Sequence, residues 1–143
     1  MSRHTSSVMI VEDDREIADL LKETLEEAGY EVCGCAESLK EGLSLDARFE
    51  PALAIIDIHL AHDESGVELA CRLSRRRRLG VLFASSHCHE VDSAGEISGG
   101  CLCKPYKPAD VLRALRIVEQ VMARGTASER SPRGFRLLRN QSC

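Results

Sequence analysis

The chain of 143 residues carries a formal net charge of −4 at pH 7, with 43% hydrophobic and 29% charged residues. This composition is typical of one globular domain with a buried core. No apolar run reaches the ~18 residues that a membrane span requires, and the amino end lacks the apolar stretch of a signal peptide. We therefore expect a cytoplasmic protein without membrane insertion. Seven cysteines are too sparse for a secreted disulfide scaffold, so reduced thiols are expected.

Short apolar runs alternate with amphipathic stretches as far as residue 123. The amphipathic stretches keep a helical spacing of apolar residues, and several begin at capping residues such as Ser38. Since parallel strands need long crossover connections, this alternation predicts an α/β domain, a doubly wound five-stranded parallel sheet with helices on both faces. The expected strands are residues 8–11, 32–35, 52–57, 81–84 and 101–103, and the expected helices begin near residues 14, 38, 66 and 108.

The remaining segments are expected to be irregular. Residues 1–6 are predicted to be disordered, residues 7–123 to form the domain, and residues 124–143 to form a basic, flexible tail. The basic character is strong, because residues 104–143 contain nine Lys and Arg against three Asp and Glu. Segment 87–99 has weak periodicity and an internal glycine, which predicts a short or irregular helix. The run Arg75–Arg78 is interpreted as a solvated helix end that complements the helix dipole.

Polar side chains follow four of the five predicted strands. Glu12 and Asp13 follow the first strand, Asp57 the third, Ser85 the fourth and Lys104 the fifth. The carboxyl ends of parallel strands share one edge of a sheet, where ligands collect. Carboxylates there can hold Mg²⁺, and a carboxylate can attack a phosphoryl group that lysine and hydroxyl groups stabilise. The simpler alternative for the aspartate after the third strand is that it only starts a turn.

Several segments together resemble the response-regulator receiver domain of two-component and phosphorelay signalling, over roughly residues 7–123. They are Ile10–Asp14, Ile55–Leu60 followed by Gly66, Ser85, and Lys104–Tyr106. The resemblance implies a flavodoxin-like fold in which the five strands have the order 2-1-3-4-5.

The resemblance also implies a phosphoryl-binding set. Asp57 would be the phosphoacceptor, and Lys104 would pair with the acyl phosphate. Ser85 would move its hydroxyl onto a phosphoryl oxygen as the conformational switch, and Pro105 would be structural at the site. As a phosphoprotein carrying an aspartyl phosphate, the chain would catalyse at most its own phosphorylation and dephosphorylation, so we do not expect an enzyme.

A magnesium-binding set is implied in the same way. Asp13 and Asp57 would bind Mg²⁺ directly, together with the backbone carbonyl of His59, and Glu12 would act through a water molecule. His59 and His87 occupy positions two residues beyond the acceptor and the switch, which in this family tune the lifetime of the phosphoryl group.

Two features depart from the receiver pattern. Cys101 occupies the place where receivers usually have an aromatic switch residue, so the usual coupling of hydroxyl and aromatic ring cannot operate in its normal form. The 19 positions from Ser85 to Lys104 are fewer than usual, which again predicts a shortened fourth helix and puts a standard dimer through that face in question.

The function expected from these observations is that of a single-domain response regulator. It would accept a phosphoryl group from a sensor histidine kinase or a histidine phosphotransfer protein, and signal by protein–protein contact with an unknown downstream protein or by onward transfer. The alternative is a phosphorylation-independent protein-binding module with the same fold. A third hypothesis is that the basic tail binds nucleic acid. Basic runs alone are weak motifs, so nucleic acid is not the expected partner.

Cysteine and histidine pairs are also present. Cys33 and Cys35, Cys101 and Cys103, and the run His87–His89 have the residue types of a metal site. The second and fifth strands would be opposite edges of the sheet, too far apart for one tetrahedral zinc. Small core cysteines are therefore preferred over a zinc or redox role.

Overall fold

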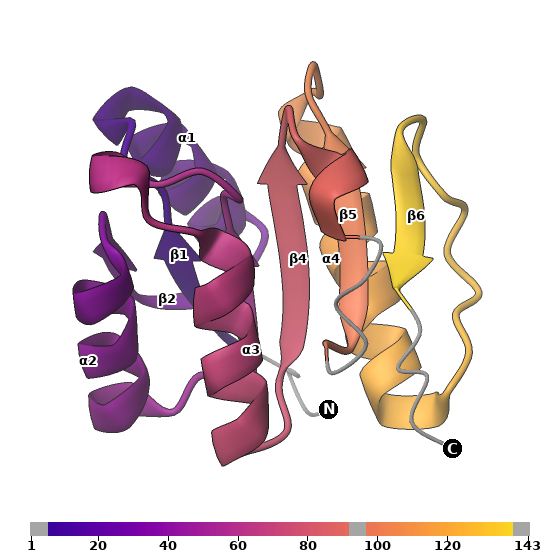
Figure 1. The fold of residues 1–143 in the computed structure, drawn as a ribbon. Helices are drawn as coiled ribbons and strands as arrows, with labels where there is room; N and C mark the ends of the chain where they lie inside the picture. Colours follow the sequence, from indigo (N-terminus) through magenta and orange to yellow (C-terminus); the bar gives the residue numbers. More distant parts are fainter. Residues whose placement is uncertain (1–5, 92–96, 139–143) are drawn as a thin grey trace.

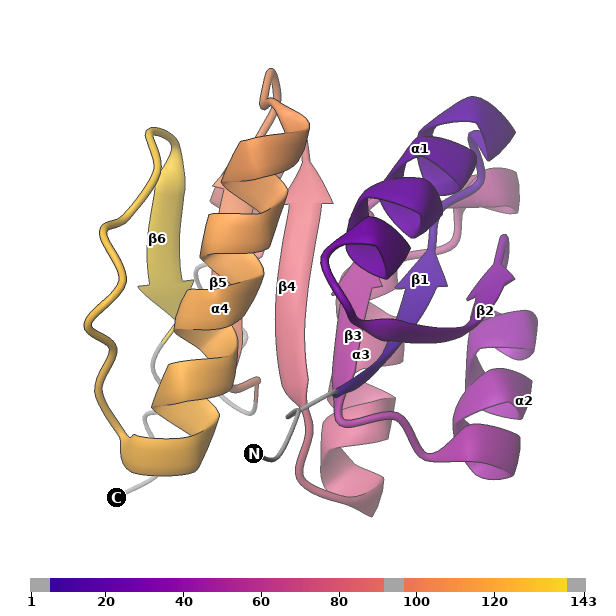
Figure 2. The same cartoon turned by 180° about the vertical axis from the view of Figure 1, so that it is seen from behind.

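A single six-stranded sheet runs through the computed structural model, which describes residues 6–91 and 97–138 (Figures 1 and 2). The order is β2-β1-β3-β4-β5-β6, and its first five strands are parallel, which confirms the predicted 2-1-3-4-5 sheet. The strands are β1 (Ser7–Val11), β2 (Glu31–Ala36), β3 (Leu53–Ile56), β4 (Gly80–Ser85), β5 (Gly99–Cys103) and β6 (Phe135–Leu138). The helices are α1 (Arg15–Glu27), α2 (Leu39–Phe49), α3 (Gly66–Arg76) and α4 (Pro108–Arg124), with short 3₁₀ helices η1 (Ala61–Asp63) and η2 (Cys88–Val91).

The helices cover both faces of the sheet. Helices α2 and α3 lie in front of it in Figure 1, and α1 and α4 cover the face seen in Figure 2. Side chains alternate along each strand, so in β1 Val8 and Ile10 join the core under α1 and α4, while Met9 and Val11 join the core under α2 and α3. This mostly aliphatic double core fixes the positions of the strand ends.

Side-chain caps fix the starts of the two helices that follow the carboxylates. The carboxylate of Asp14 accepts hydrogen bonds from the amides of Glu16 and Ile17, at 3.0 and 3.4 Å. The hydroxyl of Ser65 accepts from the amides of Val67 and Glu68 at the start of α3. Because a capping side chain satisfies free helix amides, each loop after a strand has a defined path into its helix.

The sixth strand was not predicted. Residues 124–143 were expected to be a flexible tail, but β6 pairs antiparallel with β5, with Gly100 opposite Leu137. An uncovered edge strand leaves a row of amides and carbonyls that another strand can pair with. The apolar side chains of Phe135 and Leu138 pack against the two cores, which favours docking of this part of the tail. The expected disorder of residues 1–6 falls almost wholly on residues 1–5, which lie outside the described residues.

The connection between β4 and β5 contains no α-helix in its described part. Residues 88–91 form η2, and residues 92–96 lie outside the described residues. The expectation of a short or irregular helix is therefore confirmed for residues 87–91 and 97–98.

Two cysteines in this region form a disulfide, so the expectation of reduced thiols was wrong for them. Cys88 in η2 is bonded to Cys101 in β5, with Cα atoms 6.0 Å apart. Both side chains are buried. No sequence pattern indicates this pair directly, because only the fold brings the loop after β4 back over β5.

The arginine run after α3 is only partly solvated. The guanidinium of Arg77 donates to the buried carboxylate of Asp46 in α2, at 3.2 Å from Nε and 2.5 Å from Nη2, and to the carbonyl of Pro51. Arg78 donates to the carbonyl of Met122 at 2.7 Å. These two arginines therefore connect elements, which the interpretation of a solvated helix end did not foresee.

Across residues 6–91 and 97–138, no helix combines the length and apolar character that a bilayer span needs.

Candidate functional site

Three carboxylates meet at the carboxyl ends of two adjacent strands. Glu12 and Asp13 follow β1, and Asp57 follows β3, which pairs with β1. One carboxylate oxygen from each lies within 4.8 Å of the others. This is the juxtaposition that the sequence predicted, and such a set of hard oxygen ligands fits Mg²⁺.

The absence of a side chain at Gly66 allows α3 to start directly against the Asp57 backbone. A Cβ atom at Gly66 would lie 1.9 Å from the carbonyl oxygen of Asp57, which is far closer than any real contact. The amide of Gly66 donates to the carbonyl of Ile58 at 2.7 Å. Gly66 therefore lets the start of α3 pack closely against the loop after β3 that carries Asp57.

Glu12 is the most buried of the three carboxylates. Its residue is 3% exposed, and its carboxylate accepts a hydrogen bond from the amide of Asp14 at 3.1 Å. Burial raises the pKa of Glu12 to about 7, and the neighbouring charge of Asp57 contributes to the rise. Negative charge on Glu12 is thus disfavoured by burial and by the charge of Asp57, and a divalent cation would offset both effects.

A lysine that follows β5 reaches one of these carboxylates. Lys104 Nζ lies 3.7 Å from Asp57 Oδ2, and the Asp57 side chain is 11% exposed. The Lys104 amide donates to the carbonyl of Ser85 at 3.0 Å, which joins the ends of β4 and β5. The peptide bond from Lys104 to Pro105 is cis. A cation beside a partly exposed carboxylate is well placed to stabilise an anion bound there.

Ser85 lies at the end of β4 and is fully buried. Its hydroxyl accepts a hydrogen bond from the amide of His87 at 3.1 Å. The amide of His59 makes the equivalent contact on the neighbouring loop, donating to Asp57 Oδ1 at 3.4 Å. The movement of the hydroxyl toward a phosphoryl oxygen and the ligation of Mg²⁺ by the His59 carbonyl stay predictions.

Two residues near this site were not assigned a role from sequence. The phenol oxygen of Tyr106 is buried and has no hydrogen-bond partner among the described residues. Burial raises the pKa of Tyr106 to about 12, and the charges of Glu12 and Asp57 contribute to the rise. Its place after Lys104 and Pro105 was a signal that could have been used. Glu90, which contacts His59, lies in an irregular segment that gave no such signal.

Cys101, which the sequence predicted to stand at the switch position, forms a disulfide with Cys88. The segment that follows Ser85 is therefore tied covalently to the centre of β5. This buried disulfide restricts motion of η2 relative to β5.

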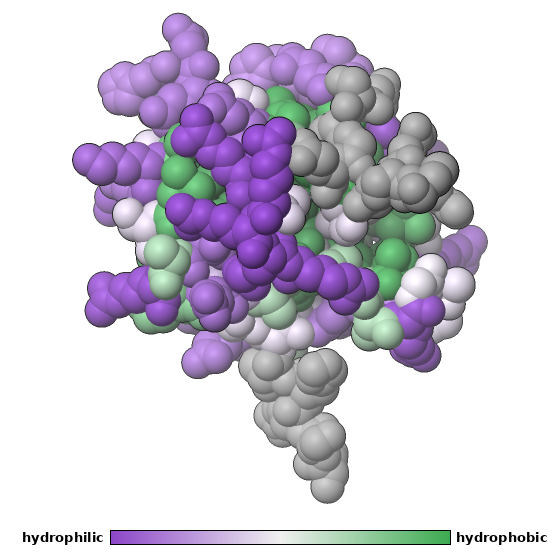
Figure 3. Space-filling view, turned by 60° about the horizontal axis from the view of Figure 1, so that its bottom comes forward, coloured by the Kyte–Doolittle hydropathy of each residue, from purple (hydrophilic) through white to green (hydrophobic). Residues whose placement is uncertain are grey.

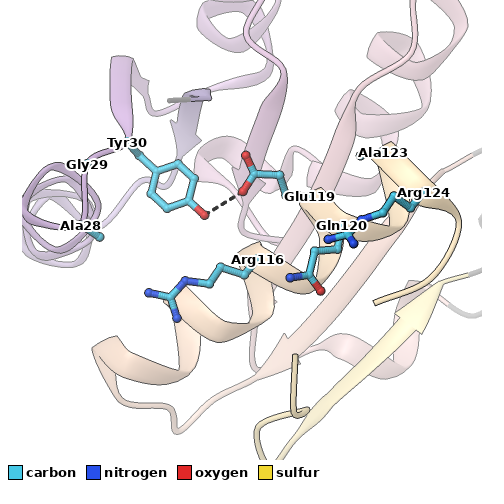
Figure 4. A pocket seen from close by; sticks show the side chains of 8 residues that line it. All are labelled: Ala28, Gly29, Tyr30, Arg116, Glu119, Gln120, Ala123 and Arg124. Atoms are coloured by element: carbon cyan, nitrogen blue, oxygen red, sulfur yellow. Dashed lines mark hydrogen bonds between the residues drawn. The ribbon is translucent and has the colours of Figure 1, made fainter. Parts of the chain in front are cut away.

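A separate pocket of about 480 Å³ lies between the end of α1 and helix α4 (Figure 4). The hydroxyl of Tyr30 donates to Glu119 at 3.0 Å inside it, and the hydroxyl of Ser6 donates to the same carboxylate. Tyr30 precedes β2, so this pocket lies toward the amino ends of the strands, away from the three carboxylates. Figure 3 views the molecule from that end, where hydrophilic side chains cover most of the visible face.

Comparisons with known proteins agree with this geometry. The family model described as "Response regulator receiver domain" matches residues 8–116. The polar-differentiation response regulator DivK of Brucella ovis is 30% identical over 121 residues, covering 82% of this chain and 97% of that protein. The aerobic respiration control protein ArcA of Escherichia coli (strain K12) is 28% identical over 129 residues, covering 87% of this chain and 53% of that protein. The chain thus spans about half the length of the first curated relatives that it matches.

Solved structures give the same result. The signal receiver domain of a modulated diguanylate cyclase from Desulfovibrio desulfuricans G20 superposes with a TM-score of 0.73 at 27% identity, covering 84% of this chain and 98% of that one. The receiver domain of the PhyR response regulator from Erythrobacter litoralis superposes with a TM-score of 0.72 at 18% identity, covering 90% and 97%. At 18% identity, the superposition with the PhyR receiver domain shows similarity of fold only.

Proposed function

This chain belongs to the response regulator receiver domain family, and on that premise we propose that Asp57 accepts a phosphoryl group in a Mg²⁺-dependent reaction. The donor would be a sensor histidine kinase or a histidine phosphotransfer protein. The observation that carries the proposal is the position of Asp57, with Lys104 Nζ at 3.7 Å on one side and the carboxylates of Glu12 and Asp13 on the other.

The chemistry follows from these groups. A carboxylate oxygen of Asp57 attacks the phosphorus of a phosphohistidine, a P–O bond forms, and the P–N bond breaks. Its electron pair leaves with the imidazole, which takes up a proton. Bound at the three carboxylates, Mg²⁺ would supply charge neutralisation for the phosphoryl oxygens. Lys104 adds a positive charge on the side of β5, and the partial burial of Asp57 strengthens both interactions because water screens them less.

The test is the mass of the intact protein after incubation with acetyl phosphate, with and without Mg²⁺. We expect one added phosphoryl group, only with Mg²⁺, and its loss in Asp57→Asn. Asp63→Asn is the matched control, because Asp63 is an exposed carboxylate of the same loop and its left-handed backbone, with φ of 58°, suits asparagine. An adduct that persists in Asp57→Asn, or no adduct at early quenched times in folded protein, would contradict the proposal.

The second candidate is a protein-binding module that acts without phosphorylation. The disulfide between Cys88 and Cys101 favours it, since it ties down the place of the usual switch residue. The same mass measurement separates the two candidates, because the binding module forms no Mg²⁺-dependent adduct. Both candidates would act through contact with a downstream protein, and the first could instead pass the phosphoryl group onward.

A further inference from the structure

Two histidines and a glutamate converge beside the phosphoacceptor loop. His59 lies two residues after Asp57. Glu90 lies in η2, and His87 directly precedes η2 in the segment after β4. His59 Nε2 is 3.0 Å from both carboxylate oxygens of Glu90, and His87 Nδ1 is 3.5 Å from Glu90 Oε2. Among the described residues this trio and the three carboxylates are the groups whose potential metal-ligand atoms lie within 4.8 Å of one another.

Two of the three spacings among these atoms fit a small divalent transition metal, and the third, between the imidazole nitrogens, lies within 4.8 Å. In a tetrahedral site with bonds near 2.05 Å, neighbouring ligand atoms are about 3.3 Å apart. The two distances to Glu90, 3.0 and 3.5 Å, lie on either side of that value. Two imidazoles and one carboxylate with a fourth position left to water is a set that zinc accepts. This set of ligands shares no residue with the cysteine pairs Cys33/Cys35 and Cys101/Cys103, whose strands are too far apart for one zinc ion.

The surroundings hold the three ligands in place. The imidazole rings of His59 and His87 are stacked, with centroids 3.9 Å apart. The disulfide to Cys101 anchors η2 to β5, and the guanidinium of Arg136 in β6 donates to the Cys88 carbonyl at 2.8 Å. These contacts limit the movement of the segment that carries His87 and Glu90, so less conformational freedom is lost on binding. The three side chains are still accessible, at 54%, 43% and 41% exposure for His59, His87 and Glu90.

We propose that His59, His87 and Glu90 form a second metal site, separate from the three carboxylates, that binds Zn²⁺ through two imidazole nitrogens and one carboxylate. The two histidines also donate their backbone amides to Asp57 and to Ser85, at 3.4 and 3.1 Å. A bound ion therefore joins the loop that carries the acceptor to the loop that carries the switch.

The test is calorimetric titration of ZnCl₂ into the full chain with excess MgCl₂, so that the three carboxylates are already occupied. Glu90→Gln and His87→Ala remove one ligand each, and His62→Asn is the matched control. His62 is an exposed histidine of the same loop as His59, and its φ of 62° suits asparagine. Mutation of a residue that only hydrogen-bonds to a metal ligand typically lowers metal affinity by roughly 10–100-fold. We therefore expect the zinc affinity of each ligand variant to fall at least about tenfold and that of the control to stay unchanged.

The imidazole nitrogens provide a direct readout that free thiols elsewhere in the chain cannot imitate. In ¹⁵N spectra of histidine side chains, one equivalent of zinc should shift the signals of His59 and His87 and leave His62 unchanged. Neither measurement needs a phosphoryl donor, so its result is independent of the proposed phosphorylation. Equal zinc affinity in the wild type and the two ligand variants, or unshifted signals of His59 and His87, would overturn the proposal.

Discussion

Cys88, in the short helix after β4, is disulfide-bonded to Cys101 in β5, across a sequence separation of 13 residues. The bond joins the segment that follows Ser85 to the strand that leads to Lys104. Both cysteines are buried. The ends of β4 and β5, which bring the Ser85 hydroxyl and Lys104 to the site, are therefore restrained by one covalent link.

Reducing this disulfide should destabilise the domain. A cross-link that closes a loop of this length stabilises a protein by roughly 2–4 kcal/mol, chiefly because it restricts the unfolded chain. We expect urea unfolding to show a loss of that order when dithiothreitol is added. The double variant Cys88→Ser, Cys101→Ser should lose stability without reductant and show no further effect of it. Equal stability of the oxidised and reduced wild type would contradict the disulfide as a stabilising link.

The docking of β6 depends on a glycine in β5. A Cβ atom at Gly100 would lie 2.4 Å from a ring carbon of Phe135. Gly100→Ala should therefore displace the ring and loosen β6, at a cost of roughly 1–3 kcal/mol for overpacking. Hydrogen exchange of the amides of residues 135–138 would measure this directly, as faster exchange in the variant. Leu137→Ala, at an exposed position of the same strand, should leave the exchange rates nearly unchanged, and equal protection in both variants would argue against the Phe135 contact.

The raised pKa of Glu12 predicts a pH dependence of stability. Its pKa is about 7 in the folded protein, against the ordinary value of 4.5 expected in the unfolded chain. Between these values the folded state holds a proton that the unfolded state has lost, so this stabilising contribution is complete below pH 4.5 and disappears as pH rises through about 7. Without Mg²⁺, the free energy of unfolding should therefore fall from about pH 5 to about pH 7.5 in the wild type. In Glu12→Gln this part of the fall should be missing, and identical pH profiles would disprove the assignment.

Loss of the ion pair between Arg77 and Asp46 should lower the free energy of unfolding more than loss of a neighbouring arginine of the run. Asp46 is 2% exposed and accepts two hydrogen bonds from Arg77. Removing one partner of a buried pair leaves an uncompensated charge and typically costs ~3–5 kcal/mol. Arg77→Met should lose stability of that order in urea unfolding.

Two further variants separate the pair from general charge effects. The double variant Arg77→Met/Asp46→Asn has no buried charge, so much of the stability lost in Arg77→Met should return. Together with the two single variants it completes a double-mutant cycle, which gives the coupling energy of the pair. Arg76→Met is the control, because Arg76 is half exposed and its guanidinium lies 4.0 Å from Asp46. A loss as large in Arg76→Met as in Arg77→Met would show that net charge, rather than the buried pair, is responsible.

The alternation of apolar strands and amphipathic helices was enough to predict the five-stranded parallel sheet and its edge of polar residues. Glu12, Asp57 and Lys104 could be placed together from sequence, because parallel strands all end at the same edge and each of these residues follows a strand. The periodicity of β-strands and helices is local, so a chain reveals it directly. The match of motifs to a known family then supplied expected roles for these residues.

The tertiary structure alone decided which distant segments meet beyond that edge. Three contacts each involve at least one segment without a regular sequence pattern: the disulfide between Cys88 and Cys101, the pairing of β6 with β5, and the convergence of His59 with Glu90. Their contacts depend on the direction of loops and on shape, such as the space that Gly100 leaves for Phe135. Such contacts are set by packing between distant parts of the chain, which no local pattern of residues encodes.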